Sequence, residues 1–265
     1  MSYDTLDLTV DARGVAYVTM NRPDKRNALS AQMMDDLTDL AQTLGADAAT
    51  RAIVLSGHGK AFCAGGDLEW MKTQINANRA TRIAEAGRLA DMLQALNTMP
   101  TPLIASIHGA ALGGGIGIAC VSDVAIADTT AKFGLTETKL GLVPATIGPY
   151  VIARMGEGFA RRVFMSSRIF DAAEAEILGI IARHVDADGL DAAVEAEVAP
   201  YLSVAPNAVG AAKALARSLG TPIERQVIDD TIERLVDIWE GEEAAHGLDA
   251  FLNKTAPRWA AKPDD

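Results

Sequence analysis

The chain opens with two stretches in which apolar and polar residues alternate. Residues 6–10 and 15–20 follow the period of two that is typical of half-buried strands, and residues 11–14, ending in glycine, separate them. The period then changes. Apolar residues recur at helical spacing through residues 31–44, directly after Ser30, a residue type that favours the N-cap position. We therefore expect a β-hairpin followed by a helix.

Further along, short runs of branched apolar residues predict buried strands, and longer periodic stretches predict helices. After Pro144 the strand signals thin to one, and helical periods dominate the remainder. This order of elements predicts an α/β core followed by a helical C-terminal piece. The expected strands are residues 52–56, 103–107, 123–127 and about 180–185, and the expected helices are 80–99, 116–121, 188–202, 207–219 and 223–243.

Composition narrows the class of protein. The 265 residues are 49% hydrophobic, enough for one domain or one domain with an appended subdomain. The two cysteines, Cys63 and Cys120, are far apart and show neither disulfide-framework nor zinc-knuckle spacing. The first ten residues lack the basic and apolar regions of a signal peptide, and no apolar run reaches the length of a membrane span. We expect a cytoplasmic protein that does not bind membranes.

A formal net charge of −11 and a pI near 4.8 argue against a nucleic-acid surface, because phosphate binding needs clustered Lys and Arg. The four histidines show no HExxH or paired spacing, so we expect no metal site. Any anionic ligand would therefore have to meet a small local group of basic residues.

Two glycine-rich loops are the strongest candidates for chemistry. Each follows a predicted strand and precedes a helix: residues 60–68, with Gly65 and Gly66, and residues 108–115, with three consecutive glycines. Glycine lets the backbone approach a ligand closely, and the first N–H groups of a helix lack intrahelical partners. Two such N–H groups aimed at one oxygen would form an oxyanion hole. The alternative reading is that these glycines serve only turns and close packing.

A third candidate is Glu137, in the segment Phe133-Gly134-Leu135-Thr136-Glu137. An apolar setting of this kind raises the pKa of a carboxyl group toward the range useful for proton transfer. The alternative is an ordinary surface carboxylate. Cys63 lies in the first glycine loop, but no histidine pattern supports it as a nucleophile, and His58 and His108 fit turn or packing roles.

Together, the segments AFCAGGDL, HGAALGGG and FGLTETKLGLVP resemble the enoyl-CoA hydratase/isomerase (crotonase) superfamily in order and spacing, and so do NRPDKRNALS and GLDAFLNKTAPRW near the ends. The resemblance implies a ββα superhelix core with two sheets over residues 1–200. It also implies a helical oligomerisation region over residues 201–265 that makes trimers, often paired into hexamers.

The resemblance also implies roles for individual residues. Gly66 and Gly114 would donate their N–H groups to the thioester oxygen, and Glu137 would carry the proton. Coenzyme A would enter as part of the substrate, with no separate cofactor. The residues implied to contact it are Lys25, Arg26, Ala28, Ala64, Gly65, Asp67, Leu68, Phe251 and Lys254.

One position departs from the two-glutamate pattern of the superfamily's hydratases. Gly117 stands where the first glutamate is expected, so only Glu137 remains. The chain most resembles bacterial methylglutaconyl-CoA hydratases and their isoprenoid-acid relatives, which also have glycine there. This implies hydration of a branched, carboxylated enoyl-CoA in leucine or acyclic-terpene breakdown. Lys139 and Arg154 are candidate partners of the distal carboxylate, and the alternative, which we favour, is that both are ordinary solvated side chains. The alternatives are a 3-enoyl to 2-enoyl-CoA isomerase and a non-catalytic acyl-CoA or RNA binder.

Overall fold

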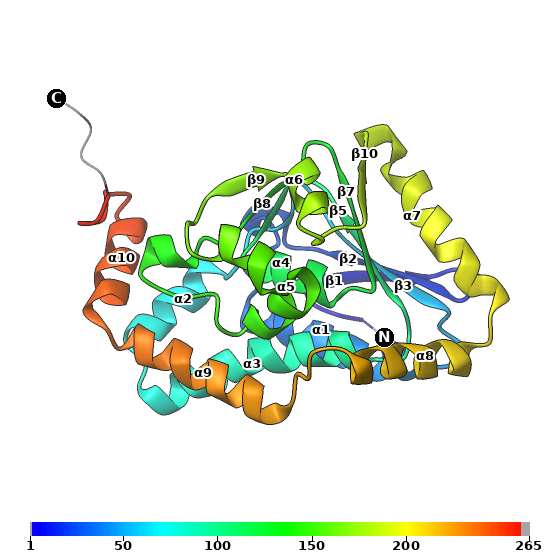
Figure 1. Ribbon diagram of the computed structural model, residues 1–265, viewed down its shortest axis with the longest axis horizontal. Helices are drawn as coiled ribbons and strands as arrows, with labels where there is room; N and C mark the ends of the chain where they lie inside the picture. The colour runs from blue at the N-terminus through cyan, green and yellow to red at the C-terminus, as the bar shows by residue number, and fades with distance from the viewer. Residues whose placement is uncertain (1, 261–265) are drawn as a thin grey trace.

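The computed structural model describes residues 2–260, which form two β-sheets surrounded by helices (Figure 1). The larger sheet has the strand order β1-β2-β3-β5-β7-β10, in which β1 is antiparallel to β2 and the other neighbours are parallel. Its strands are β1 (Leu6–Val10), β2 (Val15–Met20), β3 (Ala52–Gly57), β5 (Leu103–Ile107), β7 (Val124–Asp128) and β10 (Arg183–Val185).

The smaller sheet is made of strands of three residues each. Its order is β4-β6-β8-β9, and the first three strands run parallel. The strands are β4 (Ala61–Cys63), β6 (Ala110–Leu112), β8 (Lys132–Gly134) and β9 (Ile169–Asp171). Each of β4, β6 and β8 follows a long strand of the larger sheet after a brief turn, which gives the repeated ββα units that the resemblance implies.

The helices follow these strand pairs and then continue to the end of the described chain. They are α1 (Ala31–Thr43), α2 (Leu68–Ile75), α3 (Arg79–Thr98), α4 (Gly114–Val121), α5 (Gly148–Phe164), α6 (Ala172–Ile177), α7 (Leu190–Val198), α8 (Pro206–Leu219), α9 (Arg225–Trp239) and α10 (Glu242–Leu252). Short 3₁₀ helices are η1 (Pro23–Lys25), η2 (Leu44–Ala46), η3 (Glu137–Leu140), η4 (Ala187–Gly189) and η5 (Ala199–Ser203).

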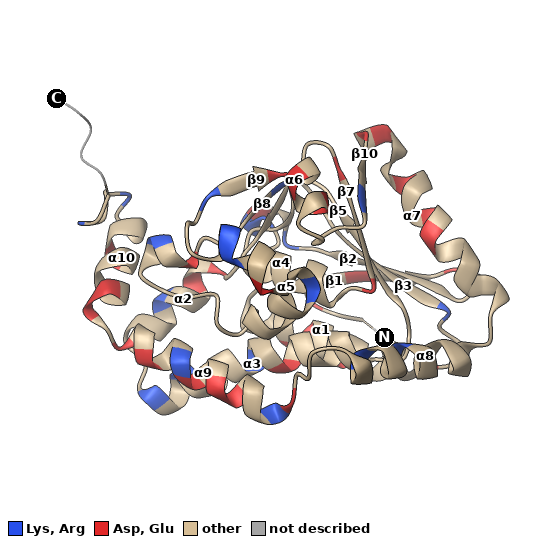
Figure 2. Ribbon diagram, in the orientation of Figure 1, with Lys and Arg blue, Asp and Glu red and all other residues tan. Residues whose placement is uncertain are grey.

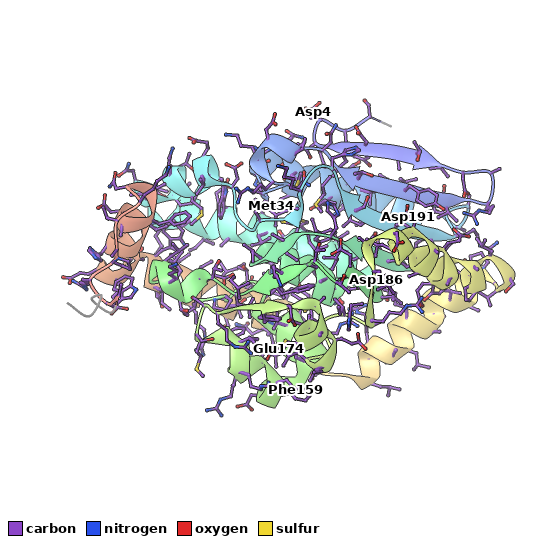
Figure 3. The ribbon with its side chains drawn as sticks, turned by 90° about the horizontal axis from the view of Figure 1, so that it is seen from above. Asp4, Met34, Phe159, Glu174, Asp186 and Asp191 are labelled. Atoms are coloured by element: carbon purple, nitrogen blue, oxygen red, sulfur yellow. The ribbon has the colours of Figure 1, made fainter. Side chains whose placement is uncertain are left out.

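The period-two pattern of the strands divides the core into two layers of packing. One face of the larger sheet, including Val15 and Val54, packs against α7. The other face, including Val18 and Leu55, packs against α1, α3 and α4 in the main core. Met34 of α1 lies in the interior, whereas Phe159 of α5 lies at the periphery (Figure 3). The main core therefore lies between the larger sheet and the helices that carry the candidate segments.

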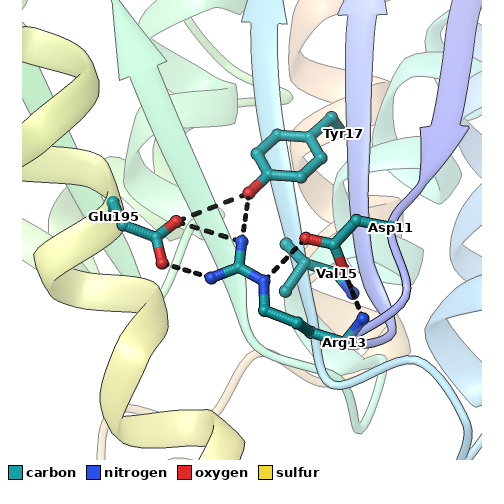
Figure 4. A network of polar contacts seen from close by, with 5 residues as sticks. All are labelled: Asp11, Arg13, Val15, Tyr17 and Glu195. Carbon is teal, nitrogen blue, oxygen red and sulfur yellow. Dashed lines mark hydrogen bonds and ion pairs between the residues drawn. The ribbon is translucent and has the colours of Figure 1, made fainter.

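The turn of the first hairpin is tied to α7 by a polar network (Figure 4). Arg13 pairs with Glu195 of α7 and donates from Nη2 to the Tyr17 hydroxyl at 2.8 Å. Asp11 accepts from the Arg13 and Val15 amides at 2.8 and 3.0 Å. The network holds α7 over the apolar face of the sheet, although its members are partly exposed and each ion pair contributes little stability.

The last two helices fold back over the core of the same chain. Isoleucines of α9 pack against Ala86 and Ala90 of α3. Helix α10 lies directly on η3: a Cβ at Gly247 would lie 2.3 Å from the Leu140 carbonyl oxygen, and one at Gly141 would lie 2.4 Å from that of Glu243. Only glycine permits this approach, so α10 fixes the backbone that carries Glu137.

Most predicted elements are present, with shifts at their ends. The first hairpin and the strand at residues 103–107 are confirmed without change, and Ser30 caps α1 by accepting from the Met33 amide. The predicted helix at 223–243 is wrong as one helix: α9 ends at Trp239, and Gly241 is the N-cap of α10. The single late strand was also wrong, because β9 precedes β10.

Among residues 2–260, no helix combines the length and the apolar content needed to span a membrane.

Candidate active site

Three parallel strands of the smaller sheet bring the candidate segments to one edge. Strand β4 leads into Ala64-Gly65-Gly66-Asp67, β6 leads into the three glycines, and β8 leads within three residues to Glu137. Because β4, β6 and β8 are neighbours, their carboxyl ends lie side by side. Loops at the carboxyl ends of parallel strands are where ligands bind in α/β folds.

A cavity of about 600 Å³ opens at this edge. Eleven of the twelve predicted site residues line it: Lys25, Arg26, Ala28, Ala64, Gly65, Gly66, Asp67, Leu68, Gly114, Glu137 and Phe251. Lys254 does not, and its side chain is exposed. The exposed Lys25 and Arg26 place positive charge at the rim, while the wall is largely apolar, with Trp70, Met71, Leu89, Leu142, Val143, Leu235 and Trp239.

The loop of residues 64–67 is held rigidly at its far end by Asp67. The Asp67 carboxylate is buried, accepts from the Glu69 and Trp70 amides at the start of α2, and pairs with Arg22 at 2.8 Å. Burial alone would raise the pKa of Asp67, but the Arg22 guanidinium and the two amides lower it below its usual range. All of its oxygens are engaged, so Asp67 fixes the loop.

Asn27 fixes the segment on the other side of this loop. Its fully buried side chain donates to the His58 and Ala61 carbonyls at 2.9 and 2.8 Å and accepts from the Arg22 amide at 2.9 Å. Its backbone is left-handed, with φ 52°, which asparagine tolerates better than most residues. Asn27 thereby anchors Ala28 and Leu29 beside the glycine loop.

Leu29 connects the two glycine segments. Its amide donates to the Gly65 carbonyl at 2.8 Å, and its own carbonyl accepts from the Asp67 amide at 3.0 Å. Its side chain lies against Gly114, where a Cβ would be 2.6 Å from Leu29 Cδ1. The Gly66 and Gly114 amides lie within these two segments, and neither donates a hydrogen bond to any part of the described chain. Two unpaired donors on one cavity wall suit a developing oxyanion.

The structure also answers why glycines occupy these positions. Gly115 is required by packing, since a Cβ there would lie 2.7 Å from the Cys63 carbonyl oxygen, and Gly114 is required by Leu29. Gly66 is different: its φ is not left-handed, and a Cβ would meet only Met71 and Trp70 at ordinary distances. Close packing therefore explains the glycines at positions 114 and 115. At position 66 packing leaves room for a side chain, which would lie beside the cavity that Gly66 lines.

Glu137 lies against the backbone of the second glycine segment. Its Oε1 is 3.0 Å from where a Gly113 Cβ would be, and its Oε2 is buried and has no hydrogen-bond partner among the described residues. Burial raises the pKa of Glu137 to about 7. A carboxyl group with this pKa accepts and returns a proton near neutral pH.

The space beside Gly117 is filled by an aliphatic side chain. A Cβ at Gly117 would lie 2.8 Å from Ile147 Cγ2 and 3.4 Å from Leu93 Cδ2. A glutamate therefore does not fit at position 117 in this packing. Core side chains occupy the space that a second carboxylate would need, so the absence of the glutamate is accompanied by a change in packing.

The remaining residues considered from the sequence do not line the cavity. Burial raises the pKa of the Cys63 thiol to about 12, so it is a poor nucleophile. Neither His58 nor His108 lines the cavity. The hypothesis that Lys139 or Arg154 meets a distal carboxylate is wrong for the cavity of this chain: Lys139 is exposed and off the lining, and Arg154 donates to the Cys120 carbonyl at the end of α4.

Several residues of the site carried no signal in the sequence. Leu29 and Ile147, which line the cavity, have the pattern of ordinary apolar residues, and Arg22, which pairs with Asp67, has that of a charge near a turn. Trp70 is held at the wall by a hydrogen bond from Nε1 to Glu85 at 2.7 Å. Trp239 arrives from α9, more than a hundred residues after Glu137. No local pattern indicated that these residues would meet.

In the part of the chain that the structure describes, no three His, Cys, Asp or Glu side chains gather closely enough to hold a metal ion.

Comparison with known proteins gives a consistent result. The sequence model of the enoyl-CoA hydratase/isomerase family matches residues 11–262. The protein echA8 of Mycobacterium bovis, named as an enoyl-CoA hydratase, is 35% identical over 264 residues, covering 98% of this chain and 99% of its own.

Solved structures agree. An enoyl-CoA hydratase from Shewanella pealeana superposes with a TM-score of 0.79 at 37% identity, covering 97% of each chain. Pseudomonas aeruginosa AtuE superposes with a TM-score of 0.79 at 38% identity, covering 97% of this chain and 100% of its own.

The raised pKa of Glu137 predicts a pH-dependent stability difference. Below about pH 4.5 the carboxyl is protonated in both the folded and unfolded states, so burying it carries no charge penalty. Between about pH 4.5 and pH 7 the unfolded state releases this proton while the folded state keeps it, so stability falls over this range and levels off above about pH 7. The Glu137→Gln variant should gain up to about 3 kcal/mol over wild type between pH 5 and 8, with no further gain above.

Urea unfolding of both proteins across this pH range measures the difference. All other titrating groups are shared, so they cancel. A constant difference from pH 5 to pH 8 would contradict the burial of the carboxyl group.

Proposed function

The chain belongs to the enoyl-CoA hydratase/isomerase family, and we propose that it adds water across the 2,3 double bond of an enoyl-CoA through an enolate. The observation that carries this proposal is the meeting of three groups on one cavity wall. The unpaired Gly66 and Gly114 amides lie in segments joined by Leu29. Glu137, whose Oε2 is buried and has no partner among the described residues, lies with its Oε1 against Gly113. The names of two relatives, echA8 and the Shewanella pealeana protein, are those of enoyl-CoA hydratases and support hydration.

The mechanism follows from the groups present. The thioester oxygen accepts hydrogen bonds from the two amides, which stabilise the negative charge that develops there during attack. Glu137 takes a proton from water as the water oxygen bonds to C3, and it then returns a proton to C2. Two oxyanion-hole donors each contribute about 3 to 4 kcal/mol in other enzymes, and proton transfer adds about a hundred- to ten-thousand-fold.

Coenzyme A is proposed to enter as the carrier of the acyl group, with no separate cofactor. The exposed Lys25 and Arg26 at the rim supply the local positive charge that its phosphates need on a chain of net charge −11. Ala64 to Leu68 and Phe251 offer backbone groups and apolar surface along the entrance. Lys254 joins them only if it contacts a second copy of the chain.

We propose a branched acyl chain, of the 3-methylglutaconyl-CoA type. The glycine at position 117 and the single Glu137 support this assignment, and the apolar lining residues Met71, Leu142 and Trp239 are compatible with a branched chain. The only Lys and Arg that line the cavity in the described chain are Lys25 and Arg26. A distal carboxylate therefore gains little from this chain's own charges.

Turnover should depend on Glu137. The Glu137→Gln variant should lose activity by a hundredfold or more while still binding an acyl-CoA, because the oxyanion hole remains and the proton carrier is gone. Thioester absorbance with crotonyl-CoA measures turnover, and calorimetry with a saturated acyl-CoA measures binding. Surviving turnover would require another base.

Water uptake separates hydration from the alternative reaction, which the single glutamate also permits. A hydratase incorporates ¹⁸O from labelled water into its product. A 3-enoyl to 2-enoyl-CoA isomerase gains conjugated absorbance from a 3-enoyl-CoA without ¹⁸O, and that result would replace the proposal. A wild-type protein that binds acyl-CoA and turns over neither substrate is a binder.

A matched pair of substrates tests the acyl chain. 3-Methylglutaconyl-CoA and 3-methylcrotonyl-CoA differ only in the distal carboxylate. We expect both to be hydrated, with kcat/KM values within about tenfold of each other. The reason is that, among the described residues, no Lys or Arg other than Lys25 and Arg26 at the rim lines the cavity to bind the distal carboxylate. A preference for the carboxylate above a hundredfold would show that a cation reaches the acyl end from elsewhere, and failure of both would contradict the branched chain.

Residues 201–265 are proposed to mediate assembly into a trimer or a dimer of trimers. Helix α8 buries none of its residues, and Leu215 and Leu219 are 60% and 79% exposed. Figure 2 shows few charges on α8 beside the densely charged α9. Light scattering should give three or six times the chain mass of 27.9 kDa, and Leu215→Glu should lower it. A single-chain mass for the wild type would contradict the proposal.

A further inference from the structure

Thr146 is a polar residue that no sequence pattern indicated as part of a site. It lies in the short segment between η3 and α5, is 5% exposed, and lines the same cavity as Glu137. Its hydroxyl makes no hydrogen bond with the described residues. It is also absent from the buried polar atoms that are closed off from solvent, so the small exposed part of Thr146 includes its oxygen. Thr146 therefore combines a solvent-accessible hydroxyl oxygen with a place in the lining of the cavity.

The position of Thr146 is tied to the missing carboxylate. The next residue, Ile147, fills the space where a side chain at Gly117 would begin, with Cγ2 2.8 Å from that Cβ position. Ile147 also lines the cavity, whereas Gly117 does not. The same segment thus closes the site of the first glutamate with one residue and presents a hydroxyl with its neighbour.

An unpartnered hydroxyl in a largely buried position is costly, because valine would fill the same volume without a polar atom to desolvate. Among the other buried threonines, Thr5 donates to Asp36 at 2.7 Å, whereas the Thr50 and Thr101 hydroxyls make no hydrogen bond with the described residues and line a different cavity. Thr146 differs from these two in lining the cavity that Glu137 lines, so its unused hydroxyl is available to a ligand atom there.

We propose that the Thr146 hydroxyl holds the attacking water, in place of the carboxylate excluded at Gly117. The inference rests on the proposed hydration. One hydrogen of the water is directed to Glu137 and the other to Thr146 Oγ1, so that a water lone pair faces C3 of the bound enoyl group. Two acceptors orient one water, and the charge that a second carboxylate would bring to an already costly buried site is avoided.

The proton balance involves Glu137 alone. The water oxygen bonds to C3, its proton passes to the Glu137 carboxylate, and the electron pair of the 2,3 double bond moves toward the thioester oxygen. Glu137 then gives a proton to C2 as the enolate collapses. Thr146 accepts a hydrogen bond throughout and neither gains nor loses a proton, so it is a positioning residue for water.

The test compares Thr146→Val with Thr146→Ser. Valine keeps the shape and removes the hydroxyl, and serine keeps the hydroxyl and removes a methyl group. For hydration of crotonyl-CoA, we expect kcat of Thr146→Val to fall about 10- to 100-fold with KM nearly unchanged, and Thr146→Ser to stay within about threefold of wild type. Thermal unfolding checks that both variants fold.

A second measurement distinguishes an effect on the position of the water from an effect on the oxyanion hole or Glu137. Butyryl-CoA has no double bond to hydrate, yet exchange of its C2 hydrogen in D₂O requires the oxyanion hole and Glu137. Thr146→Val should retain this exchange within about threefold, whereas Glu137→Gln should lose it.

Each outcome decides. Full hydration by Thr146→Val, or equal loss of hydration and exchange, overturns the role of Thr146, and so does equal loss in Thr146→Ser. If the wild type exchanges C2 hydrogen but takes up no ¹⁸O from water, the proposed hydration itself fails and this inference falls with it. That result is read from the wild type alone, so the two failures are distinguishable.

Discussion

The carboxyl group of Glu137 lies against the backbone of Gly113, and the rest of the site is arranged around this contact. The contact is possible only because position 113 carries no side chain. Gly65 lies close on the other side, since a Gly113 Cβ would be 3.8 Å from the Gly65 Cα. Three chain segments from three neighbouring strands thus converge, with the Glu137 side chain lying against the backbone of two glycine segments. Gly66, Gly114 and Glu137 line the cavity beside them.

This arrangement is costly in isolation and is stabilised by its surroundings. A buried carboxyl without a partner and two unpaired amides all oppose folding. Asn27, Asp67 and Leu29 hold the loops in place through their hydrogen bonds. Preorganised dipoles of this kind need no reorganisation when charge develops, which accounts for the cost if the site carries out the proposed enolate chemistry.

The extent to which the sequence predicted this structure differs by element. Strands of five or six residues, such as β2 and β5, showed their period clearly, and their ends were predicted to within about two residues. The strands of the smaller sheet could not be predicted from alternating apolar and polar residues, because a strand of three residues, such as β4, is too short to show that alternation. It entered only through the family resemblance.

The residues of the site also divide into those with a local sequence signal and those without one. Glycine and glutamate stand out in apolar surroundings, so the loops and Glu137 were selected from the sequence. The contacts of Ile147 and Leu29 depend on tertiary approach, for which a single sequence has no signal. Thr146 was equally hidden, since a threonine before a helix ordinarily reads as a cap.

The packing of α10 on η3 has a consequence for how the protein is made. Gly141 and Gly247 bring the backbone of the last described helix against the turn that starts at Glu137. The ribosome releases α10 after all of the described strands have emerged. A nascent chain with these strands and both glycine loops in place still lacks the helix that supports the backbone of Glu137. The proposed proton carrier is therefore held in place only once residues 242–252 have left the ribosome.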